Sequence, residues 1–293
     1  MDDAIDHQIS LDPGGRNCRP LYTAARETGG GPLVDRAADR LIAAIEPGAT
    51  VLVSTGFPIT PVDTPETDGP LGAAVLGRAV ARLGAVPVFV VDSSTQPIMT
   101  AVAAALGLEP SRIVTPTAAE TLLARDTPRV LVAVETPGRT ADGSYRNMAG
   151  EDITHLVDGV DDLFIEAADR DIPTVGVGDG GNEIGMGTVN SAVETHIDHG
   201  ETVAAVTAVD DLVVSGVSNW GAYGIVAALS LSVGENLLHT PDQERAMLAA
   251  CVEAGALDGV TGQSTLSVDG LPSPIHEHLV GLLNRLCEHS LSG

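Results

Sequence analysis

Lysine is absent from this chain of 293 residues, so all 15 of its basic side chains are arginines. Against them stand 40 aspartates and glutamates, which give a formal net charge of −25. A charge of this sign and size repels nucleic acids and anionic membrane surfaces, and we expect neither as a partner. Most of the carboxylates fit the solvated surface of a halophilic protein, where salt screens self-repulsion. Cation binding therefore accounts for only a few of them.

Cysteine is scarce as well, and its three residues are far apart and form no CxxC pair: Cys18, Cys251 and Cys287. Their number and spacing support neither a disulfide framework nor a structural zinc site. The N-terminus lacks the basic start and apolar run of a secretory signal, so we expect a cytoplasmic protein. The uncharged run over residues 212–234 is long enough to span a bilayer. Polar residues and glycines divide it, however, and a buried strand, loop and helix fits it better.

Short runs rich in Val and Ile alternate along the chain with longer Ala- and Leu-rich segments at helical spacing. This pattern predicts an α/β fold, a three-layer α-β-α arrangement around a mostly parallel, doubly wound sheet. The expected strands cover residues 50–54, 86–91, 112–114, 130–134, 174–177 and 212–214. The expected helices cover residues 34–45, 71–83, 97–106, 118–125, 160–170, 191–199, 220–238 and 242–254. We expect one domain over residues 33–293, behind an N-terminal extension, residues 1–32, that is disordered in part.

The loop after the first expected strand is the first candidate site, because ligands of open α/β sheets bind at the carboxyl ends of strands. Thr55 and Gly56 begin this loop, and Glu66, Thr67 and Asp68 end it before a helix. The start of that helix offers free N–H groups and a positive dipole end to an anionic substrate group. Asp68 equally fits a simple cap of the helix, so capping and catalysis both stay open for it.

The loop after the fourth expected strand begins with Glu135, and Arg139 follows in a turn. A guanidinium binds a substrate carboxylate well, and this chain has only 15 of them. Arg139 equally fits an ion pair with one of the many acidic residues nearby.

A glycine-rich segment, residues 176–187, follows the fifth expected strand and surrounds Asp179, Asn182 and Glu183. A loop with so few side chains lets its backbone approach a ligand closely. Its glycines also satisfy the G-x-G-x-x-G pattern of dinucleotide sites, but acidic residues there disfavour a pyrophosphate. Hard oxygen ligands without histidine or cysteine favour Mg or Mn instead.

Together these loops resemble the D-glutamate cyclase family. The resemblance is carried by residues 55–58, 66–70, 138–143, 155–158, 161–164, 176–187, 216–221 and 268–272. It implies conversion of D-glutamate, a small amino-acid substrate, to 5-oxo-D-proline and water by a hydro-lyase.

A mechanism for this reaction needs a neutral amine and a γ-carboxylate made electrophilic, which a divalent Mn or Mg ion favours by neutralising charge. The candidate metal ligands are Glu66, Asp68, Asp179 and Glu183. Glu135 or Asp68 would be the general base. The candidate substrate contacts are Thr55, Gly56, Thr67, Arg139, Gly180, Asn182, Ser218 and Asn219. A Mn- or Mg-dependent phosphohydrolase and a non-catalytic metal or nucleotide binder remain alternatives, and a homo-oligomer stays open.

Overall fold

The computed structural model describes residues 2–60, 62, 64–108 and 112–292. Six parallel strands form its central sheet: β1 Thr50–Thr55, β4 Val86–Val90, β5 Arg112–Val114, β6 Val130–Val134, β7 Thr174–Gly178 and β8 Asp211–Val214. The strand order is β5-β4-β1-β6-β7-β8, so the chain winds outward from β1 in one direction and then from β6 in the other. The predicted doubly wound sheet is therefore confirmed, and its topological switch point lies between β1 and β6.

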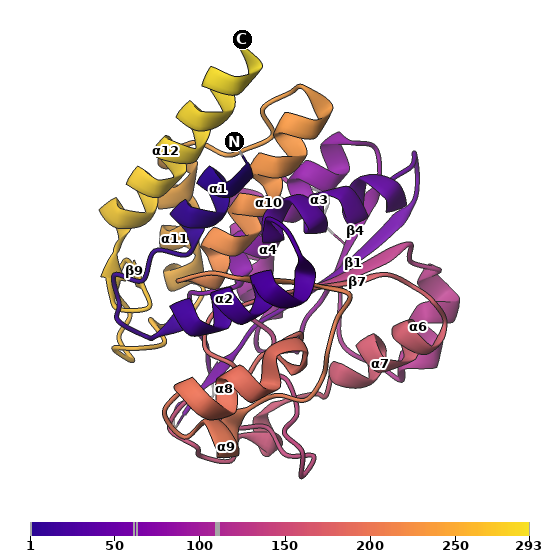
Figure 1. Cartoon of the computed structure of the whole chain (residues 1–293), viewed down its shortest axis with the longest axis vertical. Coiled ribbons are helices and arrows are strands. Elements are labelled where there is room, and N and C mark those ends of the chain that lie inside the picture. Colours follow the sequence, from indigo (N-terminus) through magenta and orange to yellow (C-terminus); the bar gives the residue numbers. More distant parts are fainter. Residues whose placement is uncertain (1, 61, 63, 109–111, 293) are drawn as a thin grey trace.

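Side chains alternate between the two faces of the sheet, as a strand requires. Val51 and Val53 belong to the larger core cluster, whereas Leu52 belongs to the smaller one on the other face. The larger cluster includes helices α3 Leu33–Ala44, α4 Pro70–Arg82, α5 Gln96–Ala105 and α10 Ser218–Val233. The smaller includes α6 Ala119–Asp126 and α7 Asp161–Asp169. Figure 1 shows these two groups of helices on either side of the sheet, which confirms the three layers.

The eight predicted helices are all present, and the two not yet described are α8 Asn190–His196 and α11 Pro241–Glu253. Two of the eight end three or more residues earlier than predicted. α10 stops at Val233 because Gly234 adopts the left-handed conformation, with φ at 77°. α8 stops at His196, and a separate short helix, α9 Gly200–Val203, follows it.

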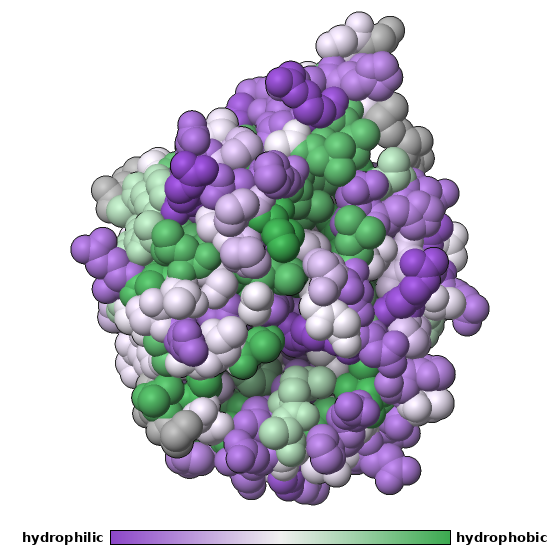
Figure 2. Space-filling view, turned by 90° about the vertical axis from the view of Figure 1, so that its left-hand side faces the viewer, coloured by the Kyte–Doolittle hydropathy of each residue, from purple (hydrophilic) through white to green (hydrophobic). Residues whose placement is uncertain are grey.

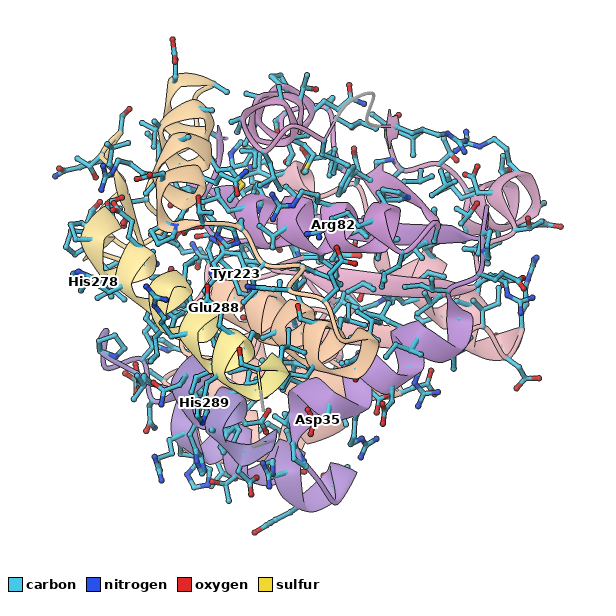
Figure 3. All side chains as sticks on the ribbon, turned by 90° about the horizontal axis from the view of Figure 1, so that it is seen from above. Asp35, Arg82, Tyr223, His278, Glu288 and His289 are labelled. Atoms are coloured by element: carbon cyan, nitrogen blue, oxygen red, sulfur yellow. The ribbon has the colours of Figure 1, made fainter. Side chains whose placement is uncertain are left out.

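Other elements have no counterpart in the prediction. They are α1 Asp2–Ile9, α2 Cys18–Gly29, α12 Ser273–Leu291, two 3-10 turns at Thr154–Leu156 and Gly187–Val189, and the hairpins formed by β2 Pro58–Ile59 with β3 Thr64–Pro65 and by β9 Ser267–Val268 with β10 Leu271–Pro272. Viewed from above in Figure 3, α12 lies across α10, on which Tyr223 is labelled. Among the described helices, none is both long and apolar enough to cross a membrane.

The N-terminal helices are part of the main core, although the sequence analysis places them in an extension. Ile5, Ile9 and Leu21 are fully buried in the larger core cluster. The buried carboxylate of Asp6 accepts hydrogen bonds from the first two backbone N–H groups of α3, at 2.8 and 3.1 Å. Because the residue before α3 is Pro32, which offers no capping side chain, α1 supplies the cap for this helix.

Candidate active site

A cleft of about 580 Å³ opens at the carboxyl ends of the strands. Glu135, which follows β6, lies on its wall, and so does Phe57, which follows β1 by two residues. The cleft therefore lies at the switch point, where ligands bind in sheets of this topology. Figure 2 looks onto the side of the molecule that carries β9 and shows hydrophilic residues in a hollow near its centre.

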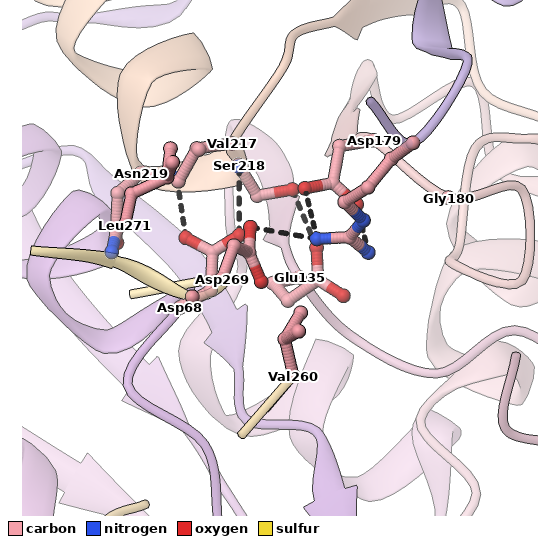
Figure 4. Close-up of polar contacts among 12 residues, drawn as sticks. Asp68, Glu135, Asp179, Gly180, Val217, Ser218, Asn219, Val260, Asp269 and Leu271 are labelled. Atoms are coloured by element: carbon pink, nitrogen blue, oxygen red, sulfur yellow. Dashed lines mark hydrogen bonds and ion pairs between the residues drawn. The ribbon is translucent and has the colours of Figure 1, made fainter. Parts of the chain in front are cut away.

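Five buried carboxylates meet beside this cleft, and two of them, Glu135 and Asp269, line it. Oxygens of Asp68, Asp179 and Asp269 all lie within 4.8 Å of one another, and so do oxygens of Glu135, Asp179 and Glu183. Asp179 is common to both sets. Figure 4 labels it together with Asp68, Glu135 and Asp269. Four of the five follow the strand ends that the sequence analysis singled out, whereas Asp269 comes from the hairpin β9–β10. We call these five residues the acidic cluster.

Asp68 caps a helix, but not the one that follows it. Its carboxylate accepts the backbone N–H groups of Ser218 and Asn219, both at 2.8 Å, at the start of α10. In return, the side-chain oxygen of Asn219 accepts N–H groups of Gly69 and Gly72, at 3.1 and 2.6 Å, at the start of α4. The two helices therefore exchange caps, and the exchange fixes Asp68 and Ser218 relative to each other.

Glu135 occupies a strained position at the end of β6. Its φ is 46°, in the left-handed region that side chains other than glycine rarely adopt. Its buried carboxylate accepts a hydrogen bond from the Ser218 hydroxyl. Backbone strain at a buried acid is typical of functional sites.

The first prediction concerns the backbone strain at Glu135. The variants Glu135→Ala and Glu135→Gly both remove the carboxylate, so their difference in stability reports the strain. We expect the glycine variant to be more stable than the alanine variant by about 1 kcal/mol, since glycine tolerates a positive φ. The order should reverse at Glu166 in α7, where glycine costs about 1 kcal/mol relative to alanine in a helix. Urea unfolding of the four variants measures both differences, and the same order at the two positions would contradict the strained backbone.

Glu183 organises the glycine-rich loop from within. Its carboxylate accepts three backbone N–H groups, from Asp179 at 3.0 Å, Gly180 at 2.6 Å and Gly181 at 2.7 Å. Converging N–H groups of this kind form an anion site, and here the anion is the protein's own side chain. The loop follows β7 rather than β1, so neither its place nor its donors suit a pyrophosphate.

Asp269 reaches the acidic cluster through a tight turn. It has φ at 54° and Gly270 has φ at 75°, the two positive values of a type I′ hairpin turn between β9 and β10. The Asp-Gly pair is the sequence signal that could have revealed this hairpin. It could not have revealed where the turn lies in space.

Arg16 also enters the acidic cluster, and the sequence analysis missed it. Its guanidinium forms ion pairs with Asp179 at 2.8 Å and with Asp269 at 2.7 Å. It comes from the loop between α1 and α2, far in sequence from both aspartates. One guanidinium does not neutralise five carboxylates, so the cluster keeps an excess of negative charge.

Burial is the main cause of the raised pKa values in this group. Burial, with the nearby Asp269 carboxylate, raises the pKa of Asp68 to about 8, although N–H groups of Asn219 and Ser218 oppose the shift. Burial and the Glu183 carboxylate raise the pKa of Glu135 well above its usual range. Burial also raises the pKa of Asp179, against the lowering effect of Arg16. Protons or cations must therefore compensate these carboxylates at neutral pH.

The other predicted residues divide into two groups. Glu66 and Asn182 line the cleft, and burial with the Asp269 carboxylate raises the pKa of Glu66, but Glu66 belongs to neither close set of oxygens. Thr67 donates its hydroxyl to the backbone of Ser267, which ties this loop to the hairpin of Asp269.

The remaining predicted residues lie beside the cleft rather than on its wall. Thr55 and Gly56 are buried and line a separate, smaller cavity, and the backbone N–H of Gly180 is bound by Glu183. Arg139 pairs with Asp161 and Asp162, the alternative left open by the sequence, and is not among the described residues that line the cleft.

The fold and this site define a doubly wound α/β protein with a carboxylate-rich cleft at its switch point. More narrowly, the chain belongs to the D-glutamate cyclase-like family: the family described as "D-glutamate cyclase-like, C-terminal" matches residues 5–284. The chain is also 34% identical over 315 aligned residues to a Homo sapiens protein, "D-glutamate cyclase, mitochondrial". The alignment covers 92% of this chain and 48% of the human protein, so the chain spans about half the length of this relative.

Proposed function

We propose that this chain catalyses the metal-dependent cyclisation of D-glutamate to 5-oxo-D-proline with release of water. The observation that carries the proposal is the convergence of five buried carboxylates beside a cleft at the switch point. The printed name of the human relative supports the substrate. Because the chain spans about half of that protein, its activity in isolation is part of the proposal.

The acidic cluster fits a hard divalent cation. Both close sets of oxygens consist of carboxylates alone, the donors that Mg²⁺ and Mn²⁺ prefer. Asp179 would hold the ion, with Asp68 and Asp269 or with Glu135 and Glu183. Bound there, the ion would supply Lewis-acid polarisation of the substrate's γ-carboxylate and neutralise its charge.

The reaction joins the substrate nitrogen to the carbon of its γ-carboxyl group and breaks one carbon–oxygen bond of that group. The oxygen leaves as water with the two protons that the ammonium group loses. With the ion held by Asp179, Asp68 and Asp269, Glu135 is the candidate base that takes the ammonium proton, because its raised pKa makes its ionised form a stronger base. Ser218 donates a hydrogen bond to Glu135 and so holds the carboxylate in a fixed position. Asp68 and Asn219 keep Ser218 in place through the exchanged caps.

The alternative of a phosphohydrolase or nucleotide binder has less support from the geometry. Three groups of backbone N–H donors near the cleft would suit a phosphate. Each is already bound by a side chain of the protein: the glycine-rich loop by Glu183, the start of α10 by Asp68 and the start of α4 by Asn219. A phosphate would also meet the negative charge of the acidic cluster.

A turnover assay tests the proposal. The purified chain is incubated with D-glutamate, L-glutamate and a panel of phosphomonoesters, each with Mn²⁺, with Mg²⁺ and with EDTA. We expect 5-oxo-D-proline from D-glutamate with a metal present, none with EDTA, and no phosphate release. Glu135→Gln should remove most of the activity while the protein stays folded. Phosphate release without lactam formation would contradict this function and support the phosphohydrolase instead.

A further inference from the structure

We propose that Arg16 binds the α-carboxylate of the substrate and is the residue through which this cleft recognises an amino acid rather than a simple amine. The inference rests on the proposed function, and it assigns to Arg16 the role that the sequence suggested for Arg139.

The charge of the cleft is the first argument. Acidic side chains line it at Glu66, Glu135, Glu151, Asp198 and Asp269, so an anionic ligand is repelled from most of its wall. Among the described residues that line the cleft, Arg16 is the sole arginine, and the chain has no lysine. A substrate carboxylate that does not contact a metal ion therefore has one fixed positive side chain to bind.

The orientation of Arg16 is the second argument. Ion pairs with Asp179 and Asp269 hold the guanidinium, yet 23% of the side chain stays exposed on the cleft wall. A guanidinium carries five N–H donors, and these pairs leave donors for another acceptor. An arginine held by two buried aspartates is already positioned, so binding a carboxylate costs little side-chain entropy.

The loop that carries Arg16 is built to hold it there. The Asp12 carboxylate accepts the backbone N–H groups of Arg16 and Asn17, both at 2.8 Å. Asn17 donates its side-chain amide to the backbone of His196, across the cleft mouth, at 2.8 Å. At Gly216, a Cβ atom would lie 1.8 Å from the carbonyl oxygen of Leu11, so only glycine lets this segment pass. These contacts fix a residue from the N-terminal segment inside the site.

Arg139 is not available to bind the substrate carboxylate. Its guanidinium is paired with Asp161 and Asp162. Its backbone N–H is bound by the Asp161 carboxylate as well. These contacts give Arg139 a structural role in joining the loop after β6 to the start of α7.

Two pairs of ligands that differ by one carboxylate test the role of Arg16. D-glutamate is compared with 4-aminobutyrate, and 5-oxo-D-proline with 2-pyrrolidinone, by calorimetric titration in the presence of Mn²⁺. The proteins are the wild type, Arg16→Lys, Arg16→Gln and, as a control, Arg19→Gln, which makes the same charge change on the exposed side of α2. Thermal unfolding confirms that each variant is folded.

We expect Arg16→Gln to weaken binding of the two carboxylated ligands about 10- to 100-fold and to leave their partners nearly unchanged. Arg16→Lys should keep part of the preference for carboxylated ligands, because lysine retains the charge but not the paired N–H donors that match a carboxylate. Mn²⁺ alone should bind Arg16→Gln at least as tightly as the wild type, since a competing cation is gone. Arg19→Gln should match the wild type throughout.

If Arg16→Gln weakened the binding of Mn²⁺ and of all four ligands in parallel, the role of Arg16 would be merely structural and the inference would be overturned. An unchanged carboxylate preference would overturn it too, as would a wild type that binds none of the carboxylates. An Arg16-dependent preference without turnover of D-glutamate would refute the proposed reaction alone. Turnover with an unchanged KM in Arg16→Gln would refute the role of Arg16 alone.

Discussion

Replacing Asp179 with asparagine should lower kcat/KM for D-glutamate by about 1000-fold or more, the largest loss we expect from any single substitution. Asp179 is the one carboxylate that belongs to both close sets of oxygens in the acidic cluster. Asparagine keeps the shape of the side chain but removes the charge that attracts a divalent cation. The steady-state kinetics of the variant with saturating Mn²⁺ measure the loss.

The control for Asp179→Asn separates charge at the site from charge in general. Asp169→Asn removes one negative charge from the exposed end of α7 and should leave kcat/KM unchanged. Without metal, Asp179→Asn should be as stable as the wild type or more stable, because a buried charge among like charges has been removed. A folded Asp179→Asn variant with near wild-type kinetics would show that the ion, if it binds, binds elsewhere.

The second large effect concerns the pH dependence of the free energy of unfolding. Its slope should change sign when metal is added. Burial raises the pKa of Asp68 from 3.8 to about 8, and those of Glu135 and Asp179 are raised too. An acid whose pKa is higher in the folded state stabilises that state below the unfolded pKa and loses this contribution as pH rises through the folded value. Metal-free protein should therefore lose stability from pH 7 to pH 8.5, by about 1 kcal/mol from Asp68 alone.

With saturating Mn²⁺ the stability should rise over the same pH interval, because the ion binds ionised carboxylates and competes with protons. Urea unfolding at constant ionic strength, with and without Mn²⁺, measures both slopes. Ordinary carboxylates are already ionised throughout this interval, so the surface charge does not produce the effect. Asp68→Asn should flatten part of the metal-free slope. Equal slopes with and without metal would contradict the account.

The strands of the central sheet could be predicted from sequence because most of them are short apolar runs buried on both faces. All six were found within one residue at each end. The helices α1, α2 and α12 were missed, although α12 carries Leu279, Leu283 and Cys287 on one buried face, a spacing typical of an amphipathic helix. The sequence therefore contains the signal for this helix.

The acidic cluster was predictable where topology alone positions a residue. Asp68, Glu135, Asp179 and Glu183 follow strands, and the carboxyl ends of parallel strands meet at one edge of the sheet. Asp269 was not predicted, since its place depends on how a hairpin late in the chain folds back over that edge.

Arg16 and Asn219 show what sequence alone does not reveal. Local reasoning assigned the carboxylate clamp to Arg139, whereas the structure places Arg16 in the cleft through contacts of α1 and α2 with the core. Local reasoning also considered Asp68 as a cap for its own helix alone, beside its role in the site. The exchange of caps between α4 and α10 depends on the packing of two helices about 150 residues apart, which no local pattern encodes.

Anomalous diffraction from crystals of the metal-free chain soaked with Mn²⁺ tests the central claim most directly. The account predicts one strong manganese peak in contact with Asp179 and with oxygens of either Asp68 and Asp269 or Glu135 and Glu183. Peaks found only at exposed carboxylates, with Asp179 still bound to Arg16 alone, would contradict it.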